Sequence, residues 1–524
     1  MRARLAAVEH KWWTLFAMCF ALFMIMLDNT IVNIALPSLQ RDLHASPASL
    51  QWTIDAYILT FAVLILLGGK LGDRYGRKKM FIVGLAIFTV ASMLCALATS
   101  DSELIAFRAV QGVGGALLNP LSLSIIASTF PRKQLPTAIG IWAGVSGLGL
   151  AVGPLAGGLL VEKVSWSAVF WINVPIGVIA VLVTLWAVKE SKDPTAKHLD
   201  LPGTTLVTGG LLALVWALIK SGSHSWGSAY TLGFLGAAAV LLAAFIVWER
   251  RLDDPMLPLS FFRRRAFSVA SAVVMLVGLG MFGVIFFISL YFQNVKGYSP
   301  LQAGVRSLPM TMTLMAVAPM AGKINAKVGP RFQLTIGMLL SGIGLLGLSR
   351  LGVHSSYNAI WPFYAMMGGG LAFAMPAVSA TGMAAVDPQK AGIASGVINA
   401  SRQVGGALGI AVLGSIGASL TRSRWSDDLS ALPAATQGKL AGARELVLGG
   451  QGAVVGRIAG PQAQAAALDA FVHGVKGAML IGGILMLVAA AVAYFGLWGF
   501  RVPQPQRGEQ GEGAQAPAPA VVEL

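Results

Sequence analysis

Two charged residues stand inside long apolar runs, where a charge needs a partner or a function. Asp28 lies in Leu27-Asp28-Asn29-Thr30-Ile31, and Arg108 lies in Phe107-Arg108-Ala109-Val110-Gln111. An ionised side chain at the centre of a membrane helix costs roughly 2.5–3.5 kcal/mol on insertion scales, so such residues face protein or water and are usually functional. Burial favours a neutral acid, whereas a nearby cation favours the carboxylate. We therefore expect Asp28 and Arg108 to form a pair that couples to proton movement.

Each member of this expected pair also has a simpler explanation. Asp28 could be a structural anchor near the outer end of its helix, and Arg108 could extend its guanidinium to a membrane interface. Gln111, Gly115 and Asn119 share a helical face with Arg108 and continue the polar stripe inward. A polar stripe on a membrane helix should face the interior of the bundle. This pattern favours a buried Arg108.

A third acid, Asp55, lies near the outer start of the next apolar run, where a solvated helix cap and a role in proton coupling are equally consistent with the sequence. Farther along the chain, Asn399, Arg402 and Gln403 have spacings that place them on one side of a helix. That second half contains no comparable acid, so proton coupling is expected in the first half. The sequence predicts a cavity with these candidate lining residues: Asn29, Asn33, Tyr57, Gln111, Asn119, Asn399, Arg402 and Gln403.

A basic stretch broken by glycines separates the second and third apolar runs: Gly69-Lys70-Leu71-Gly72-Asp73-Arg74-Tyr75-Gly76-Arg77-Lys78-Lys79. Its glycines permit a tight turn and a close approach of helices. Asp73 could accept hydrogen bonds from the first amides of a helix or pair with an arginine. The simpler alternative is a solvated charged loop. We expect a gate that is closed in one global state, formed by Gly69, Gly72, Asp73, Arg74, Gly76 and Arg77.

A row of small residues in the fifth apolar run predicts close helix packing. Gly149, Gly153 and Gly157 recur at every fourth position, which lets another helix approach closely. Pro154 permits a kink. Together with Gly147, these residues are expected to form a smooth seam that packs tightly and also moves during transport.

The remaining residues do not suggest an enzyme. The six histidines are scattered over the termini and loops, and Cys19 and Cys95 lie inside apolar runs as packing thiols. We expect no catalytic residue, no metal site and no cofactor, because no such constellation is present in the sequence. A net charge of +16 would suggest nucleic-acid binding in a soluble protein. Here the cations lie in short loops between apolar runs, so we expect no nucleic-acid partner.

The elements that must position these residues are membrane helices. The chain has 524 residues, of which 56% are hydrophobic and 11% are charged, whereas soluble domains carry roughly 25% charged residues. A helix needs about 20 apolar residues to cross the hydrocarbon core. Fourteen runs are candidates, at residues 13–36, 50–69, 80–98, 104–129, 138–161, 167–188, 203–219, 229–248, 267–292, 302–325, 333–352, 358–381, 391–419 and 474–498. The sequence therefore predicts one polytopic all-α membrane protein.

The basic residues and an internal repeat predict its topology. Twenty-four lysines and arginines fall on one side of the expected spans and six fall on the other, outside the long loop 420–473, which places the basic side and both termini in the cytoplasm. Gly69-Lys70-Leu71 recurs as Gly322-Lys323-Ile324, and Gly76 recurs as Gly329. Two parallel halves with a binding cavity between them are expected. The expected divisions are an N-terminus at 1–12, a six-helix half at 13–188, a linker with two extra helices at 189–266, a second half at 267–498, and a disordered tail at 499–524.

In combination, the stretch 69–79, the face from Arg108 to Gly115, the glycine seam that ends at Pro154, and the fourteen runs resemble the fourteen-spanner drug:proton antiporters of the major facilitator superfamily. The resemblance extends over residues 13–498. It implies a major facilitator fold in the cell membrane and proton-driven export of lipophilic, including cationic, drugs or antibiotics by alternating access.

The resemblance also carries expectations for individual residues. Asp28, Asp55, Asp73 and Arg108 match family positions tied to coupling or gating, and the glycine seam is associated with export. Some multidrug members carry acids in two later spans that lack them here, which argues against polyvalent cations as substrates. We expect a functional monomer. Export of one endogenous metabolite, lipid or siderophore is the alternative, and a non-transporting membrane sensor is a third reading.

The stretch 69–79 and its repeat make one prediction. Asp73→Ala should slow transport severely, because the expected gate loses its acid, whereas Ala326→Asp at the repeated position should have little effect or over-stabilise the outward-facing state. Transport by purified protein in proteoliposomes, at matched expression, measures both. Normal flux through Asp73→Ala would reduce the stretch to a topology signal.

Overall fold

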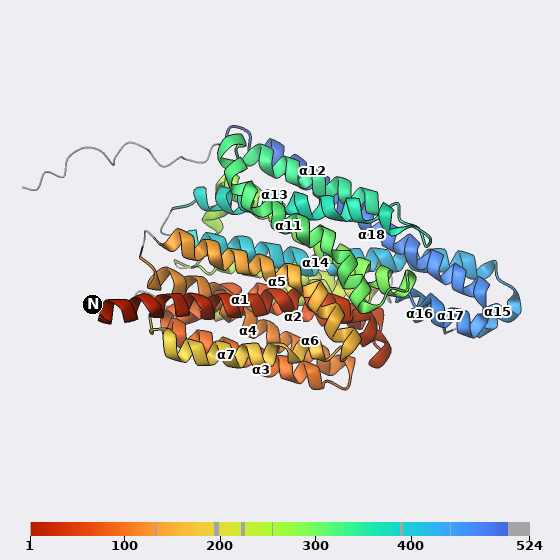
Figure 1. Ribbon diagram of the computed structural model, residues 1–524. Coiled ribbons are helices and arrows are strands. Elements are labelled where there is room, and N and C mark those ends of the chain that lie inside the picture. The colour runs from red at the N-terminus through yellow and green to blue at the C-terminus, as the bar shows by residue number, and fades with distance from the viewer. Residues whose placement is uncertain are drawn as a thin grey trace, which may run out of the picture.

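The computed structural model describes residues 2–131, 134–192, 199–221, 226–253, 255–387, 391–440 and 442–500. Over these ranges the protein is helical and contains no strand (Figure 1). Thirteen helical segments are long and apolar enough to cross a membrane. A further helix, α11 (Pro300–Val328), has 29 residues, including two internal prolines. Each of the fourteen expected runs therefore corresponds to a helix.

The first six spans form one group of helices, which lies in the lower part of Figure 1. The group consists of α1 (Arg2–Asp42), α2 (Pro47–Tyr75), α3 (Arg77–Leu97), α4 (Asp101–Thr129), α5 (Leu135–Lys163), and a span made of α6 (Ala168–Trp171) and α7 (Asn173–Ala187). Serine caps begin two of these helices, since Ser46 accepts a hydrogen bond from Ser49 N and Ser100 accepts one from Glu103 N. We call this set the first group.

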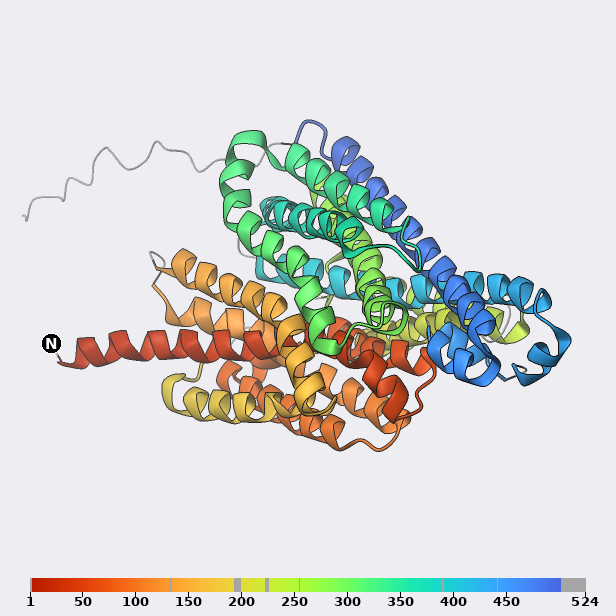
Figure 2. The same ribbon diagram turned by 45° about the vertical axis from the view of Figure 1, so that its right-hand side comes forward.

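The last six spans form the second group. It consists of α10 (Arg265–Leu290) continued by η2 (Tyr291–Val295), α11, α12 (Pro330–Leu348), α13 (Trp361–Ala384), α14 (Ala391–Ser430) and α18 (Pro461–Gly496), with the short η1 (Leu259–Arg263) and η3 (Tyr357–Ala359) between them. The N-terminus and the end of α18 lie on one side of the bundle, which we call the terminal face (Figure 1). The two groups diverge toward this face, as Figure 2 shows from a second angle.

Two additional helices, α8 (Leu201–Lys220) and α9 (Ala229–Glu249), connect the two groups. α8 contacts both α2 and α14, and α9 packs against α8. The hydroxyl of Ser221, at the end of α8, lies 2.6 Å from the hydroxyl of Ser415 in α14. The rings of Trp216 in α8 and Trp52 in α2 lie 5.5 Å apart. The inserted pair thus covers the line along which α2 of the first group meets α14 of the second.

The expected long loop at 420–473 is mostly helical, which corrects the sequence prediction. α14 continues to Ser430, α18 already begins at Pro461, and α15 (Ala434–Lys439), α16 (Arg444–Leu448) and α17 (Gly452–Ala459) lie between them. These elements project from the side opposite the terminal face, which we call the opposite face (Figure 1). They have a small apolar core of their own: Trp425, Leu440, Ala443, Val447, Val455, Ala463, Ala467 and Ala470. A local core explains why this segment adopts helices outside the bundle.

The basic stretch 69–79 contains the tight glycine turn that the sequence predicted, but most of the stretch is helical. α2 continues to Tyr75 and α3 begins at Arg77, so Gly76 alone breaks the chain, with φ +111°. The repeated glycine, Gly329, separates α11 from α12 with φ +82°. Both positions need a positive φ, which favours glycine. The repeat seen in the sequence therefore reproduces the same backbone break.

These two glycines differ in their surroundings and yield a matched prediction. A Cβ atom added at Gly76 would lie 2.8 Å from the carboxyl carbon of Glu190, whereas one added at Gly329 would meet nothing within 4 Å. Each alanine variant carries the backbone strain of a positive φ, of order 1–3 kcal/mol. Gly76→Ala should therefore lower the melting temperature in detergent more than Gly329→Ala does. Equal shifts of the melting temperature in the two variants would show that the contact with Glu190 does not add to the destabilisation.

Candidate functional site

The centre of the first group holds a buried ion pair. Arg108 Nη1 lies 2.6 Å from Asp28 Oδ2, and the two side chains are 1% and 0% exposed. Gln111 Nε2 donates to Asp28 Oδ1 at 3.0 Å, and its Oε1 accepts from Arg108 Nη1 at 2.7 Å. The predicted pairing of Asp28 with Arg108 is confirmed. Snorkelling of Arg108 to an interface is excluded by its burial.

Further contacts tie this pair to three more helices. Asn173 Nδ2 of α7 lies 3.2 Å from Asp28 Oδ1 and 3.0 Å from Ser92 Oγ of α3. Arg108 Nε donates to the backbone oxygen of Thr53 in α2 at 3.1 Å. Asn173 and Ser92 were not among the residues predicted from the sequence. A lone amide within an apolar run was the available signal, because such side chains hydrogen-bond across membrane helices.

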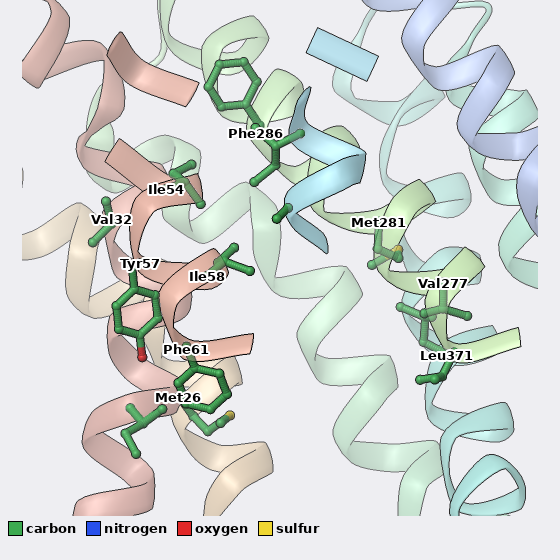
Figure 3. Packing of buried hydrophobic residues seen from close by; sticks show 14 of the residues in the cluster. Met26, Val32, Ile54, Tyr57, Ile58, Phe61, Val277, Met281, Phe286 and Leu371 are labelled. Carbon is green, nitrogen blue, oxygen red and sulfur yellow. The ribbon is translucent and has the colours of Figure 1, made fainter. Parts of the chain in front are cut away.

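Tyr57 completes the surroundings of the pair rather than lining a cavity. The guanidinium carbon of Arg108 lies 4.2 Å from the centre of the Tyr57 ring, a cation–π geometry. Figure 3 shows Tyr57 beside Val32 of α1, whereas Ile54 and Ile58 of the same helix point toward α14. One face of α2 therefore supports the ion pair and another packs against the second group.

Asp55 is buried, and its carboxylate has no hydrogen-bond partner among the described residues. The residue is 0% exposed, and neither carboxyl oxygen has a hydrogen-bond partner in the part of the chain that the structure describes. One turn earlier on α2, the side chain of Gln51 lies against Gly414 of α14. The N-cap of α2 is Ser46. The alternative of a solvated cap at Asp55 is therefore excluded.

A cavity of about 190 Å³ lies between the two groups. It is lined by Met26, Asn29, Thr30, Asn33, Ile34, Leu150, Pro154, Val277, Met281, Phe282, Ile285, Ile288, Ser289, Ser307, Met310, Thr311, Leu314, Tyr364, Leu371, Met375 and Arg402. Figure 3 shows Val277, Met281 and Leu371 close together on the second-group side. Three predicted cavity residues, Asn29, Asn33 and Arg402, line it.

The other predicted cavity residues lie elsewhere. Gln111 and Tyr57 belong to the ion-pair cluster, and Gln403 is buried outside the lining. Asn399 Nδ2 donates to Asn119 Oδ1 at 3.2 Å, which links α14 to α4 across the two groups. The apolar lining was missed because a methionine that faces a cavity and one that faces lipid look alike in sequence.

The cavity is closed toward the opposite face by contacts between the groups. Gln293 Nε2 donates to the backbone oxygen of Ile34 at 2.9 Å, and the Ser289 hydroxyl donates to that of Asn33. The amide of Leu301 donates to Glu162 Oε2 at 3.0 Å. Asn294 Nδ2 donates to Gln40 Oε1 at 3.3 Å and to the backbone oxygen of Gly449 at 2.8 Å. The segment that contains α15–α17 thus takes part in this closure.

The glycine seam packs inside the first group and does not separate the two groups. A Cβ at Gly149 would lie 2.8 Å from Met26 Cβ, and one at Gly157 would lie 2.8 Å from Ile31 Cγ1; Gly153 faces Thr30 in the same way. All three contacts are with α1. Gly147 does not belong to this seam, because a Cβ there would meet nothing within 4 Å.

A different side of α5 meets the second group. Gly158 lies against Pro300 and Leu301, and the carbonyl of Pro154 lies against Gly304. Pro154 also lines the cavity. The surface of α5 that contacts α11 therefore carries Pro154, which belongs to the expected seam, and Gly158, which the sequence did not single out.

The stretch 69–79 is held by its own residues and by Glu190. Arg77 Nη2 pairs with Asp73 Oδ1 at 2.7 Å. The first amides of α3 are bound by Glu190 instead of Asp73, since Lys78 N and Lys79 N donate to its two carboxyl oxygens at 3.0 and 3.1 Å. The sequence analysis missed this acid because it lies far away in the chain.

The remaining residues of the predicted gate serve packing and local contacts. A Cβ atom added at Gly69 would lie 3.7 Å from Pro120 Cβ, and one added at Gly72 would overlap the side chain of Leu121. Because these two glycines have no side chain, α2 can approach α4 closely. The guanidinium of Arg74 lies 5.3 Å from the Tyr75 ring. The repeated position Ala326 lies outside the described side chains.

The buried pair leads to a stability prediction. Asp28→Asn should lower the melting temperature in detergent, because breaking a buried ion pair leaves an uncompensated charge and costs about 3–5 kcal/mol. Arg108→Gln should do the same. The double variant should lose less stability than the sum of the losses in the two single variants, and a double-mutant cycle measures this difference.

Arg424 provides the matched control for this cycle. It pairs with Asp469 at 3.1 Å on the exposed surface of the opposite face, where ion pairs contribute little. Arg424→Gln should leave the melting temperature nearly unchanged. Additive losses from Asp28→Asn and Arg108→Gln would contradict a direct coupling.

Comparison with known proteins agrees with this architecture. Residues 18–410 match the Major Facilitator Superfamily. The chain is 38% identical to the tetracenomycin C resistance and export protein of Streptomyces glaucescens, over 93% of this chain and 91% of that protein. It is 36% identical to the puromycin resistance protein pur8 of Streptomyces alboniger, over 82% and 86% of the two chains. A bacterial homologue of the human lysosomal transporter Spinster, solved in an inward-facing conformation, superposes with a TM-score of 0.63 at 19% identity, over 93% of this chain and 97% of that one. With its fold and three quarters of its length matched, this chain belongs to the major facilitator superfamily of membrane transporters.

Proposed function

We propose that this transporter exports lipophilic antibiotics or drugs from the cytoplasm in exchange for protons. The observation that carries the proposal is the position of the Asp28–Arg108 pair beside the cavity. Asp28 is bound inside the first group, while the next residues, Asn29 and Thr30, line the cavity between the groups. A change in the protonation of Asp28 can therefore reach the cavity wall directly through α1.

The shape of the bundle supports an alternating-access cycle. The groups are joined by hydrogen bonds near the opposite face and diverge toward the terminal face (Figure 2). The basic residues that begin α3, Arg77, Lys78 and Lys79, lie at the terminal face. Since loops rich in lysine and arginine stay in the cytoplasm, we place the terminal face and both termini there. The state described by the structure then receives its substrate from the cytoplasm.

Protonation of Asp28 has a direct structural consequence in this scheme. Arg108 holds the acid of α1 and also donates to Thr53 of α2. A neutral Asp28 would no longer balance the guanidinium, so the packing of α1 against α2 and α4 would change. Ligands couple only by binding two states differently. The proton gradient supplies about 2.3 kcal/mol per charge for each 100 mV of membrane potential.

Asp55 is the second acid assigned to the coupling. It lies on the side of α2 that meets α14 and has no donor for either oxygen among the described residues. A buried charge without partners costs several kcal/mol. We therefore place a proton on Asp55 in this state. Its release would have to accompany a rearrangement between α2 and α14.

The names of the relatives and the lining of the cavity support the proposed substrate class. Several relatives are named for resistance to single antibiotics, and others, including Stp of Mycobacterium tuberculosis, are named for multidrug resistance. The cavity wall here is mostly apolar with a few hydroxyl and amide groups. We propose that one chain in the bilayer is sufficient for transport, since both groups that form the cavity belong to the same chain.

The decisive experiment measures proton release on substrate binding. Purified protein in weakly buffered detergent is mixed with tetracenomycin C or puromycin, and a pH-sensitive dye records released protons. Wild type should release protons, and Asp28→Asn should release fewer, because one of the two acids assigned to the coupling is gone. Asp55→Asn should release fewer.

Arg424→Gln serves as the control, since it alters a charge far from the cavity. Release that is equal in wild type, Asp28→Asn and Asp55→Asn would refute the assigned acids. Uptake into proteoliposomes with and without a pH gradient then separates proton-coupled export from facilitated diffusion. A response to one compound out of a broad panel would favour a dedicated exporter.

A further inference from the structure

We infer that the cavity selects lipophilic compounds that carry an acidic group, and that Arg402 binds this group. The inference rests on the proposed function, because it takes the cavity between the groups as the substrate site. It departs from the cationic substrates that the sequence resemblance implied.

The first argument is the charge of the cavity wall. Arg402 is the only charged residue that lines it, as far as the described residues show. Its Nη2 donates to Asn399 Oδ1 at 2.9 Å, which is a neutral partner. In the described part of the chain no carboxylate lies within ion-pair distance of its guanidinium. The wall therefore carries one positive charge without a counter-ion.

The second argument is the chemistry of this side chain. A guanidinium has five N–H donors in a planar fork and stays charged in proteins. Removing such a charge from water is costly unless an acid and further acceptors compensate it. A carboxylate or phenolate on a bound molecule would accept hydrogen bonds from the fork and supply the missing charge. A cationic ligand would add a second positive charge at the same place.

The third argument is that the nearby acids are not available to a cation. Asp28 is fully buried and already accepts from Arg108, Gln111 and Asn173. Asp55 is fully buried as well and does not line the cavity. A ligand with an ammonium group would thus find no carboxylate in the described wall.

The remaining wall fits an apolar body. Four methionines, Met26, Met281, Met310 and Met375, line the cavity with Phe282, and thioether side chains adapt to irregular ligands. The hydroxyl groups of Ser307 and Thr311 are occupied by carbonyls of their own helix, at 2.9 and 3.2 Å. The arginine is therefore the strongest polar anchor. Because drug-sized ligands usually occupy roughly 300–1,000 Å³, the cavity must widen when such a molecule enters.

A matched set of probes tests the inference. 1-Pyrenebutyrate, 1-pyrenebutanol and 4-(1-pyrenyl)butylamine share one apolar body and are anionic, neutral and cationic at pH 7.5. Their affinities for the full-length protein in lipid nanodiscs are measured by tryptophan quenching, with empty nanodiscs as blank. Wild type should bind the butyrate about tenfold more tightly than the amine, the factor expected for one charge-assisted hydrogen bond.

Three variants separate charge from shape. Arg402→Gln should weaken pyrenebutyrate about tenfold and change pyrenebutanol by less than about twofold, because only the charge-assisted contact is lost. Arg402→Lys should restore part of the preference for the anion. Arg424→Gln removes an arginine of the same helix outside the cavity and should behave as wild type. Retained binding of pyrenebutanol shows that each variant is folded.

The outcomes distinguish the two proposals. Equal affinities for the three probes in wild type, or equal losses for all three in Arg402→Gln, would overturn the role of Arg402 as an anion site. Export of pyrenebutanol by wild-type proteoliposomes under a pH gradient would leave the proposed function intact in that case. If no probe binds and none is transported, the proposed function fails together with the substrate class.

Discussion

The need to keep the Arg108 charge inside a membrane protein organises the first group of helices. Its guanidinium meets Asp28 at 2.6 Å, a backbone carbonyl of α2, and the ring of Tyr57. Asp28 in turn accepts from Gln111 and Asn173, which brings in α7. Removing either charge leaves the other without compensation, which is far more costly than losing a surface pair. One electrostatic constraint therefore fixes how these helices pack around α1.

Two arginines within the bundle, Arg108 and Arg402, show opposite solutions to the same physical problem. Arg108 is neutralised by an acid of its own chain and has no exposure to the cavity. Arg402 lines the cavity, and among the described residues its guanidinium has only the amide oxygen of Asn399 as a hydrogen-bond partner. The first arrangement suits the proposed coupling, because protonation of Asp28 would remove the negative charge that balances Arg108. The second is suited to binding, because a ligand can supply what the protein does not. In the proposed cycle, this separation would let substrate and proton act on different residues, one in each group.

The proposed movement between the two groups depends on which helix contacts lie within one group and which lie between the groups. The glycines Gly149, Gly153 and Gly157 bring α5 onto α1 and make that pair one unit. The contacts between α5 and α11 involve small residues and backbone near the opposite face instead. The segment with α15–α17 adds the link between Asn294, Gln40 and Gly449 across the same closure. In the proposed cycle, opening of this face would have to break the contact with Gly449 as well as the hydrogen bonds between the helices.

The sequence by itself determined the class of protein, its helices and its internal repeat. Apolar runs of membrane length are a local property, and glycines at repeated positions kept a backbone break at both Gly76 and Gly329. The pairing of Asp28 with Arg108 was also predictable, because a membrane interior leaves few affordable partners for a charge.

Only the tertiary structure decided which polar residues face the cavity and which support the ion pair. Asn29 and Gln111 looked equivalent in sequence, yet one lines the cavity and the other binds Asp28. Glu190 caps α3 from more than a hundred residues away, so no local pattern could assign it. The apolar residues that line the cavity could not be identified from the sequence either, because side chains that face lipid and side chains that face an apolar cavity are of the same types. Which face of each helix meets which neighbour depends on the packing of the whole bundle, and hydropathy along the chain carries no record of it.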